Sequence, residues 1–239
     1  MIMFSLFLFI IGWIAATVSG IAGFGGALLL LPILSNTIDV KSAIPVLTIG
    51  QLFGNVSRAW FGRKEIKWIP VAFFISTAIP FSVTGSFFLN ILSKRIIFIV
   101  IGILLIVFVA LRRFRITQFN WGNKGLLFGG ALTGFLSGIA GSAGPIGAAF
   151  FLGLNLSATA YISSEATTAV VMHITKSIAY ERFALIGQKE IYLGIVLGAG
   201  MVSGSWTGKK IIERLPKNTF IIIVEILLFL SGLQLIFLK

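Results

Sequence analysis

The stretch Ser19-Gly20-Ile21-Ala22-Gly23-Phe24-Gly25-Gly26 decides how this chain folds. It interrupts a long apolar run whose first charged residue is Asp39. Glycine weakens helices and exposes the backbone, and an unsatisfied backbone group in lipid is costly. The sequence therefore predicts that this break lines a cavity or a bound ligand.

A closely similar stretch, Ser137-Gly138-Ile139-Ala140-Gly141-Ser142-Ala143-Gly144-Pro145, lies 118 residues later (137 − 19), again inside a long uncharged run. Matching hydrophobic segments interrupted by Gly or Pro in two halves of a chain indicate the binding site of a secondary transporter. We therefore expect the two breaks to form one site.

The composition identifies a polytopic membrane protein. Of the residues, 57% are hydrophobic and 11% are charged, whereas a soluble domain has about 25% charged residues. The net charge is +12, but the basic residues fall in short gaps between apolar runs, where they set topology and contact anionic headgroups rather than nucleic acid. With no Cys and one His, the chain has no disulfide or His/Cys metal cluster, and we expect no cofactor.

The apolar runs predict an all-α integral membrane protein of about eight transmembrane segments in two four-segment repeats. The first and fifth segments are broken at the glycine-rich motifs. The first repeat covers 1–118 and the second 119–239. The expected spans are 2–34, 42–60, 68–92 and 94–111 in the first repeat, and 124–153, 157–181, 190–210 and 217–238 in the second.

Polar positions support this duplication. At the same offset of 118 residues, Asn55 corresponds to His173 and Arg58 to Lys176. Alternate loops of eight simple crossings carry eleven Lys and Arg on one side and seven on the other, which favours cytoplasmic termini. Parallel and inverted arrangements of the two repeats both stay open.

The breaks supply the first set of candidate binding residues. A helix that starts after each break offers N–H groups and the positive end of its dipole to an anion, and proline suits a first helical position. The alternative is that these glycines only let helices pack closely. The candidates here are Gly23, Gly25, Gly26, Gly141, Ser142, Gly144 and Pro145.

Polar faces on the second and sixth spans supply the rest. Gln51, Asn55 and Arg58 share one helical face, and His173 and Lys176 occupy the equivalent face, with Glu165 two turns before His173. Polar residues within spans usually face the protein interior. Snorkelling to the interface is the alternative for Arg58 and Lys176.

Two residues are candidates for proton coupling. His173 is the single histidine and can change charge near neutral pH. Glu225 lies deep in the last span, where a carboxyl group could relay a proton or pair with a basic residue.

The two motifs, in this order and over almost the whole chain, resemble the TauE/SafE family of sulfite exporters, also called the 4-toluenesulfonate uptake permease superfamily. His173 followed by a basic residue, and Gly187-x-x-x-Ile191, are similar to a segment of that family. The resemblance implies a multi-pass plasma-membrane transporter, mostly of prokaryotes, for sulfite, organosulfonates or similar anions. Ala143 replaces a glycine usual in the family, and Asn55 stands where the second half has His173.

We therefore predict a secondary transporter of a small anion, in the lipid bilayer, working by alternating access between two repeats, with a proton or another ion as the coupling partner. A passive anion channel and a non-transporting membrane scaffold are the alternatives. The sequence has no metal-ligand cluster, no nucleophile beside a base and no nucleotide motif, so we do not expect an enzyme.

Overall fold

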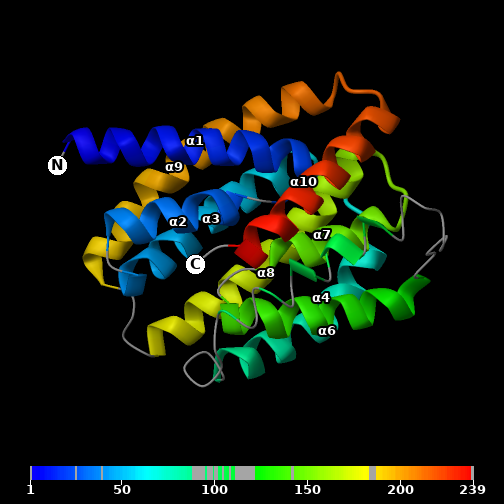
Figure 1. Cartoon of the computed structure of the whole chain (residues 1–239), viewed down its shortest axis with the longest axis horizontal. Helices are drawn as coiled ribbons and strands as arrows, with labels where there is room; N and C mark the ends of the chain where they lie inside the picture. Colours follow the sequence, from blue (N-terminus) through cyan, green and yellow to red (C-terminus); the bar gives the residue numbers. More distant parts are fainter. Residues whose placement is uncertain are drawn as a thin grey trace.

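The computed structural model of the chain describes residues 2–24, 26–38, 40–87, 122–140, 143–182 and 187–237, together with scattered positions between 95 and 110. This described part is helical and contains no strand (Figure 1). Its helices are α1 (Ile2–Ala22), α2 (Gly26–Thr37), α3 (Val40–Phe61), α4 (Trp68–Phe87), α6 (Gly122–Ala140), α7 (Gly144–Leu152), α8 (Ala158–Arg182), α9 (Gln188–Ile212) and α10 (Lys217–Phe237). The predicted span 94–111 lies largely outside these residues.

Within the described residues, α1, α4, α9 and α10 are long and apolar enough to cross a membrane, and Lys124–Ile139 of α6 forms a shorter apolar helix. Helices α3 and α8 have 22 and 25 residues, so their length would suffice. They are less apolar because they carry the two polar faces predicted from the sequence. The number of eight spans stays a prediction.

The chain breaks at both glycine motifs. Helix α1 ends at Ala22 and α2 begins at Gly26, while α6 ends at Ala140 and α7 begins at Gly144. Helix α2 turns back beside α1 (Figure 1), and Leu30 and Leu34 enter one apolar cluster with Leu8. The first motif therefore joins two helices into a hairpin, whereas a simple crossing would have kept one direction.

Contacts at glycines fix the directions of the long helices. Gly194 and Gly198 of α9 lie against Ile49 and Phe53 of α3, so these two helices are parallel. Gly62, at the end of α3, lies against Thr159 near the start of α8, so these two are antiparallel. Helices α3 and α8, the predicted counterparts in the two halves, thus run in opposite directions, and the repeat itself stays a prediction.

Rows of glycine bring two pairs of helices very close together. Gly200, Gly204 and Gly208 of α9 face the backbone of α1 at Phe9, Trp13 and Thr17. Gly130, Gly134 and Gly138 of α6 face α4 at Phe74, Ala78 and Ser82 in the same manner. Both pairs are parallel, because contacts advance by four residues on each helix. Small residues at this spacing let membrane helices approach closely.

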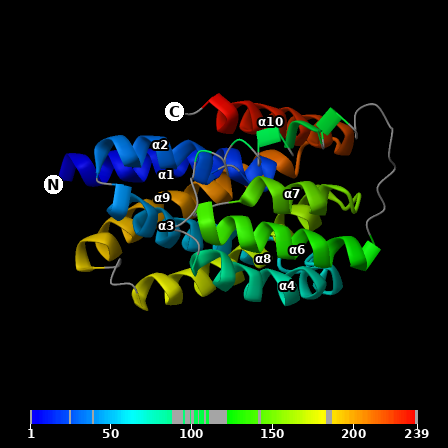
Figure 2. The ribbon, with the colours of Figure 1, turned by 60° about the horizontal axis from the view of Figure 1, so that its bottom comes forward.

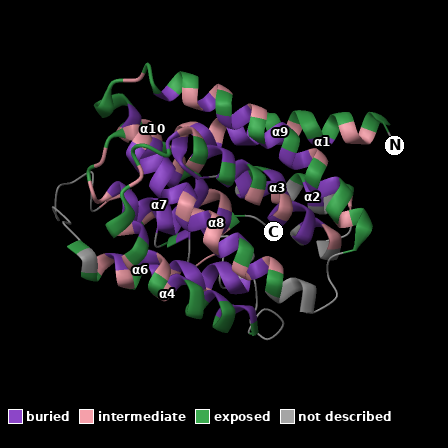
Figure 3. Ribbon diagram, turned by 180° about the vertical axis from the view of Figure 1, so that it is seen from behind, coloured by how far each residue is buried: buried purple, intermediate pink, exposed green. Residues whose placement is uncertain are grey.

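The buried apolar side chains form two clusters, which define two lobes. The first lobe contains α1, α2, α3 and α9. The second contains α4, α6, α7 and α8, with α10 packed against it (Figures 2 and 3). Residues Pro145–Leu152 of α7 are all buried. Each lobe therefore combines three consecutive helices of one half with one helix of the other half, α9 or α4.

We expect Gly204→Ala to destabilise the protein strongly, because the added Cβ would overlap the carbonyl oxygen of Trp13. Overpacking of this kind costs about 1–3 kcal/mol. Thermal unfolding in detergent measures the effect. Gly144→Ala is the matched control, since its Cβ would meet only Phe24 at 3.8 Å. Equal melting temperatures for the two variants would contradict the close packing of α1 and α9.

Candidate functional site

A small cavity lies where the two lobes meet, between α3 and α8 and beside the starts of α2 and α7. Its volume is about 30 Å³, measured to the centre of a water molecule, which is room for roughly two or three waters. Its lining residues are Phe24, Ala27, Gln51, Asn55, Arg58, Ser137, Ala143, Gly144, Pro145, Glu165, Ala169, Met172, His173 and Lys176.

Most of the predicted binding residues come together around this cavity. Those that line it are Gln51, Asn55, Arg58, Gly144, Pro145, His173 and Lys176. Gly26 adjoins it, since a Cβ there would come within 2.8 Å of the Gln51 Nε2 atom. Gly25, Gly141 and Ser142 lie outside the described residues. Glu225 is buried on α10 and is not part of the lining.

Arg58 connects three helices at one end of the cavity. Its guanidinium group donates hydrogen bonds to the carbonyl oxygens of Ser19 at 2.8 Å and Gly23 at 2.6 Å. It also donates to Asn55 Oδ1, one turn earlier on α3. The Ser19 carbonyl oxygen also accepts a hydrogen bond from Gly23 N–H at 2.8 Å. Carbonyls at the end of a helix carry the negative end of its dipole. Arg58 therefore stabilises the end of α1 at the break.

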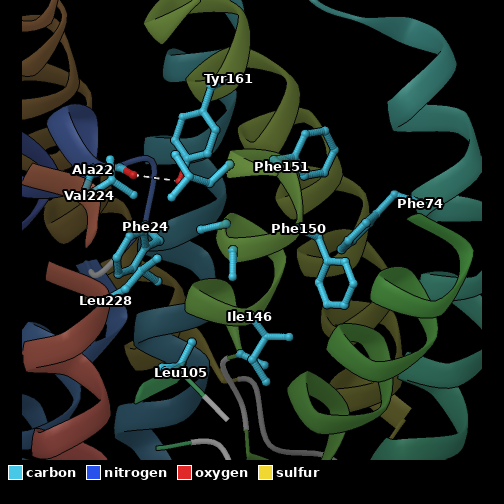
Figure 4. Close-up of a cluster of buried hydrophobic side chains, with 14 of the residues drawn as sticks. Ala22, Phe24, Phe74, Leu105, Ile146, Phe150, Phe151, Tyr161, Val224 and Leu228 are labelled. Carbon is cyan, nitrogen blue, oxygen red and sulfur yellow. Dashed lines mark hydrogen bonds between the residues drawn. The ribbon is translucent and has the colours of Figure 1, made fainter. Parts of the chain in front are cut away.

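Gly23 and Tyr161 complete this helix end. Gly23 has φ of +85°, a left-handed conformation that suits glycine. A Cβ at Gly23 would also come within 2.5 Å of the ring of Tyr161. The Tyr161 hydroxyl donates a hydrogen bond to the carbonyl oxygen of Ala22 at 3.0 Å (Figure 4). The role of Gly23 in this structure is thus to shape the break, while neighbouring residues line the cavity.

Lys176 holds a similar position in the second half. Its Nζ donates a hydrogen bond to Ser137 Oγ at 3.0 Å, and Ser137 is the predicted counterpart of Ser19. Both cations are buried, with exposed fractions of 6% for Arg58 and 1% for Lys176. Snorkelling to the membrane surface is therefore excluded for them in this structure.

Glu165 provides a negative charge that the binding prediction omitted. Its Oε2 lies 3.9 Å from Nη1 of Arg58, and both side chains are buried. Glu165 shares the helical face of Ala169 and His173, and this spacing could have identified it as a site residue from the sequence. Leu47 stands 118 residues before it, so the predicted repeat offered no second carboxylate to draw attention to this position.

Three buried polar atoms of the lining have no hydrogen-bond partner. They are Nε2 of Gln51, Nδ1 of His173 and Oε2 of Glu165, the last of which has only the ion pair with Arg58. Leaving such groups unpaired in the interior costs about 1–3 kcal/mol each. An arrangement of unpaired polar groups beside two buried cations can bind a small anion. Among the described residues, no group of three His, Cys, Asp or Glu side chains could hold a metal ion.

The coupling between Arg58 and Glu165 can be measured by a double-mutant cycle. Glu165→Gln should lower the melting temperature of the wild-type protein, because it removes the counter-charge of Arg58. In an Arg58→Met background the same change should raise it, since an unpaired buried charge costs about 3–5 kcal/mol. The same effect of Glu165→Gln in both backgrounds would show that the two groups do not interact.

Comparison with known proteins places the chain in a family. No curated protein and no solved structure matched it. The family model described as "Sulfite exporter TauE/SafE" matches residues 8–235, nearly the whole chain. That stretch includes both glycine motifs and every described residue of the cavity. The chain therefore belongs to the TauE/SafE family of sulfite exporters, a family of membrane transporters for sulfite and related anions.

Proposed function

We propose that the protein is a secondary transporter that moves a small sulfur oxyanion of the size of sulfite by alternating access. The observation that carries this proposal is the cavity between the lobes. It combines two buried cations with unpaired polar atoms of Gln51 and His173.

The charges of the cavity favour an anion. Arg58 and Lys176 are buried cations, and Glu165 is the only carboxylate among the lining residues. One small anion in the cavity would be attracted by both cations, and Gln51 Nε2 could donate a hydrogen bond to it.

The helix starts add to this preference. Ala27 in the first turn of α2 and Gly144 in the first turn of α7 both line the cavity. The first N–H groups of a helix have no partner within it, and they carry the positive end of the dipole. Two helices that begin at one cavity, one from each half of the chain, offer such groups from both lobes.

The size of the cavity bears on the substrate. A volume of about 30 Å³ accepts an anion of a few heavy atoms. Sulfite fits this description, whereas an organosulfonate with a long or aromatic substituent would require the lobes to separate. In this conformation the cavity thus favours the inorganic members of the substrate class.

The position of the site supports transport by alternating access. The lining residues come from α2, α3 and the preceding break in the first lobe, and from α6, α7 and α8 in the second. Small rotations of the lobes would expose the cavity first at one end of the molecule and then at the other. His173 lies within the lining and stays our candidate for proton coupling, together with Glu225.

The alternatives fit the structure less well. A scaffold that uses the polar faces of α3 and α8 to bind a partner would present them outward, but Gln51, Asn55, Glu165 and His173 are buried against the other helices of the chain. A passive channel would need a continuous water-filled pore, and the site described here is a small cavity between packed lobes. Saturable transport distinguishes the transporter from the channel.

The central test uses Gln51→Leu. Because Gln51 Nε2 has no partner in the structure, the variant should be at least as stable as the wild type without ligand. With sulfite present, the wild type should gain stability, by about 2.7 kcal/mol at a concentration of one hundred times Kd. Gln51→Leu should lose most of this gain and should transport sulfite into proteoliposomes at a rate at least tenfold lower.

Gln234→Leu on α10 is the matched control, since Gln234 does not line the cavity. It should retain both the sulfite-dependent stabilisation and the transport rate. Sulfate, thiosulfate and chloride complete the panel of anions. A sulfite-dependent gain that survives in Gln51→Leu would contradict the assignment of the cavity. Transport that does not saturate with sulfite would favour the channel.

A further inference from the structure

We infer that a second cavity, on the far side of Arg58, is a vestibule through which the anion reaches the central cavity from the cytoplasm, and that Arg58 is the gate between them. The inference rests on the proposed function and adds a route, a side of the membrane and a gating residue to it. Residues that line the vestibule include Gly62, Thr159, Ser205, Lys209 and Arg58.

Arg58 belongs to the lining of both cavities. On α3, Gln51 and Asn55 line the central cavity, whereas Phe61 and Gly62 line the vestibule. The two cavities therefore follow one another along α3, with Arg58 at the boundary. An anion that passes from one to the other must pass this guanidinium group.

The order of residues along α8 leads to the same conclusion. Glu165, Ala169 and His173 line the central cavity, whereas Thr159 and Ile162 line the vestibule. Because α3 and α8 are antiparallel, the end of α3 and the start of α8 lie at the same end of the molecule. The vestibule therefore opens toward that end.

The vestibule has the chemistry to receive an anion. Lys209 of α9 lines it, with a side chain that is 34% exposed. The start of α8 contributes Thr159, so the positive end of that helix dipole points to the same place. Lys209 Nζ lies 3.4 Å from Glu213 Oε1, which is 48% exposed. Such a surface ion pair is weak, so Lys209 can exchange Glu213 for an arriving anion.

The distribution of basic residues indicates which side this end faces. Helices α3 and α9 end there, and α4, α6, α8 and α10 begin there. Among the residues that the structure describes, the Lys and Arg at this end are Arg63, Lys64, Lys67, Lys124, Lys209, Lys210, Arg214 and Lys217. Those at the opposite end are Lys41, Arg95, Arg182 and Lys189.

An excess of Lys and Arg marks the cytoplasmic side of a membrane protein. The vestibule thus faces the cytoplasm, and α1 begins and α10 ends away from this side. This reverses the orientation predicted by counting alternate loops. That count placed residues 58–67 and 209–217 on opposite sides, but α3 and α9 are parallel and end together.

Arg58 has the contacts that a gate needs. Its hydrogen bonds to the Ser19 and Gly23 carbonyl oxygens keep it at the end of α1, while Glu165 lies 3.9 Å away on the opposite lobe. An anion arriving from the vestibule competes with Glu165 for the guanidinium group. When the anion replaces this carboxylate, the link between the lobes weakens and the passage to the central cavity opens.

The test uses single cysteines, because the chain contains none of its own. Thr159→Cys places a thiol in the vestibule, and Lys64→Cys places one on the exposed surface of the same end. Gln188→Cys does so at the opposite end. Each variant is exposed to anionic sulfonatoethyl methanethiosulfonate in intact cells and in inside-out vesicles, and modification of the thiol is followed by mass spectrometry.

We expect Lys64→Cys and Thr159→Cys to react in inside-out vesicles only, and Gln188→Cys in intact cells only. Thr167→Cys, on α8 but in neither cavity, should react in neither preparation. For each variant we compare the rate of modification by the anionic reagent with that by a cationic trimethylammonium reagent. The ratio of anionic to cationic rate should be about tenfold higher for Thr159→Cys than for Lys64→Cys, and adding Lys209→Gln should lower this ratio.

Several results would overturn the inference. A reactive Lys64→Cys beside an unreactive Thr159→Cys would show that no open vestibule exists. Reaction of Lys64→Cys in intact cells only would reverse the orientation. Equal rates for the two reagents would exclude an anion-selective vestibule. These labelling experiments need no substrate, so they remain interpretable if the protein does not transport sulfite. Conversely, sulfite transport could be observed even if the labelling shows that no vestibule exists.

Discussion

The arrangement of this protein depends on one buried guanidinium group. Arg58 binds the last carbonyls of α1, contacts Asn55 on its own helix and faces Glu165 across the interface between the lobes. Without a cation here, the carbonyl oxygen of Gly23 would lose its donor in the buried interior, where an unpaired backbone group is costly, and the Ser19 carbonyl oxygen would keep only Gly23 N–H. With the cation in place, the glycine break becomes stable, α2 can begin beside it, and a polar cavity can exist between apolar lobes.

In the second half of the chain, a different cation lies near the helix that ends at the glycine break. Lys176 contacts Ser137 near the end of α6, as Arg58 contacts Ser19 near the end of α1. A lysine is a compact point charge, whereas arginine offers several donors in a fixed plane, so Arg58 can bind two carbonyls, an amide and a carboxylate together. Glu165 has Leu47 at the equivalent position of the first half. The two ends of the cavity are therefore chemically unequal. The counterpart helices α3 and α8 run in opposite directions, but their side chains at the cavity differ.

The sequence alone predicted the helical membrane fold, both breaks and half of the residues that line the cavity. Glycine clusters inside apolar runs indicate breaks in membrane helices, and polar residues spaced along one face of such a helix indicate a face that is turned away from lipid. Other features depend on packing between distant segments. Gly23 was predicted to bind substrate, but its positive φ and the nearby Tyr161 ring show that it shapes the break. Local spacing could not reveal the hairpin of α1 and α2, the exchange of α4 and α9 between the lobes, or the Arg58–Glu165 pair. Because the hairpin replaces a simple crossing, it invalidated the count of Lys and Arg on alternate loops.

The exchange of helices between the lobes connects packing with transport. Glycine rows bind α9 tightly to α1, and α6 tightly to α4, so each lobe is rigid within itself. The interface between the lobes is different, because α3 and α8 meet there through polar side chains around a cavity. Apolar side chains also meet across this interface, since Ala22 and Phe24 belong to the apolar cluster of the second lobe. The unpaired atoms of Gln51 and His173 disfavour the empty, closed arrangement. In the proposed mechanism, a bound anion would satisfy these atoms and would stabilise the closed state by the difference in its affinity for the two states. The polar groups that make the empty cavity costly would then provide the free energy with which a substrate closes the lobes.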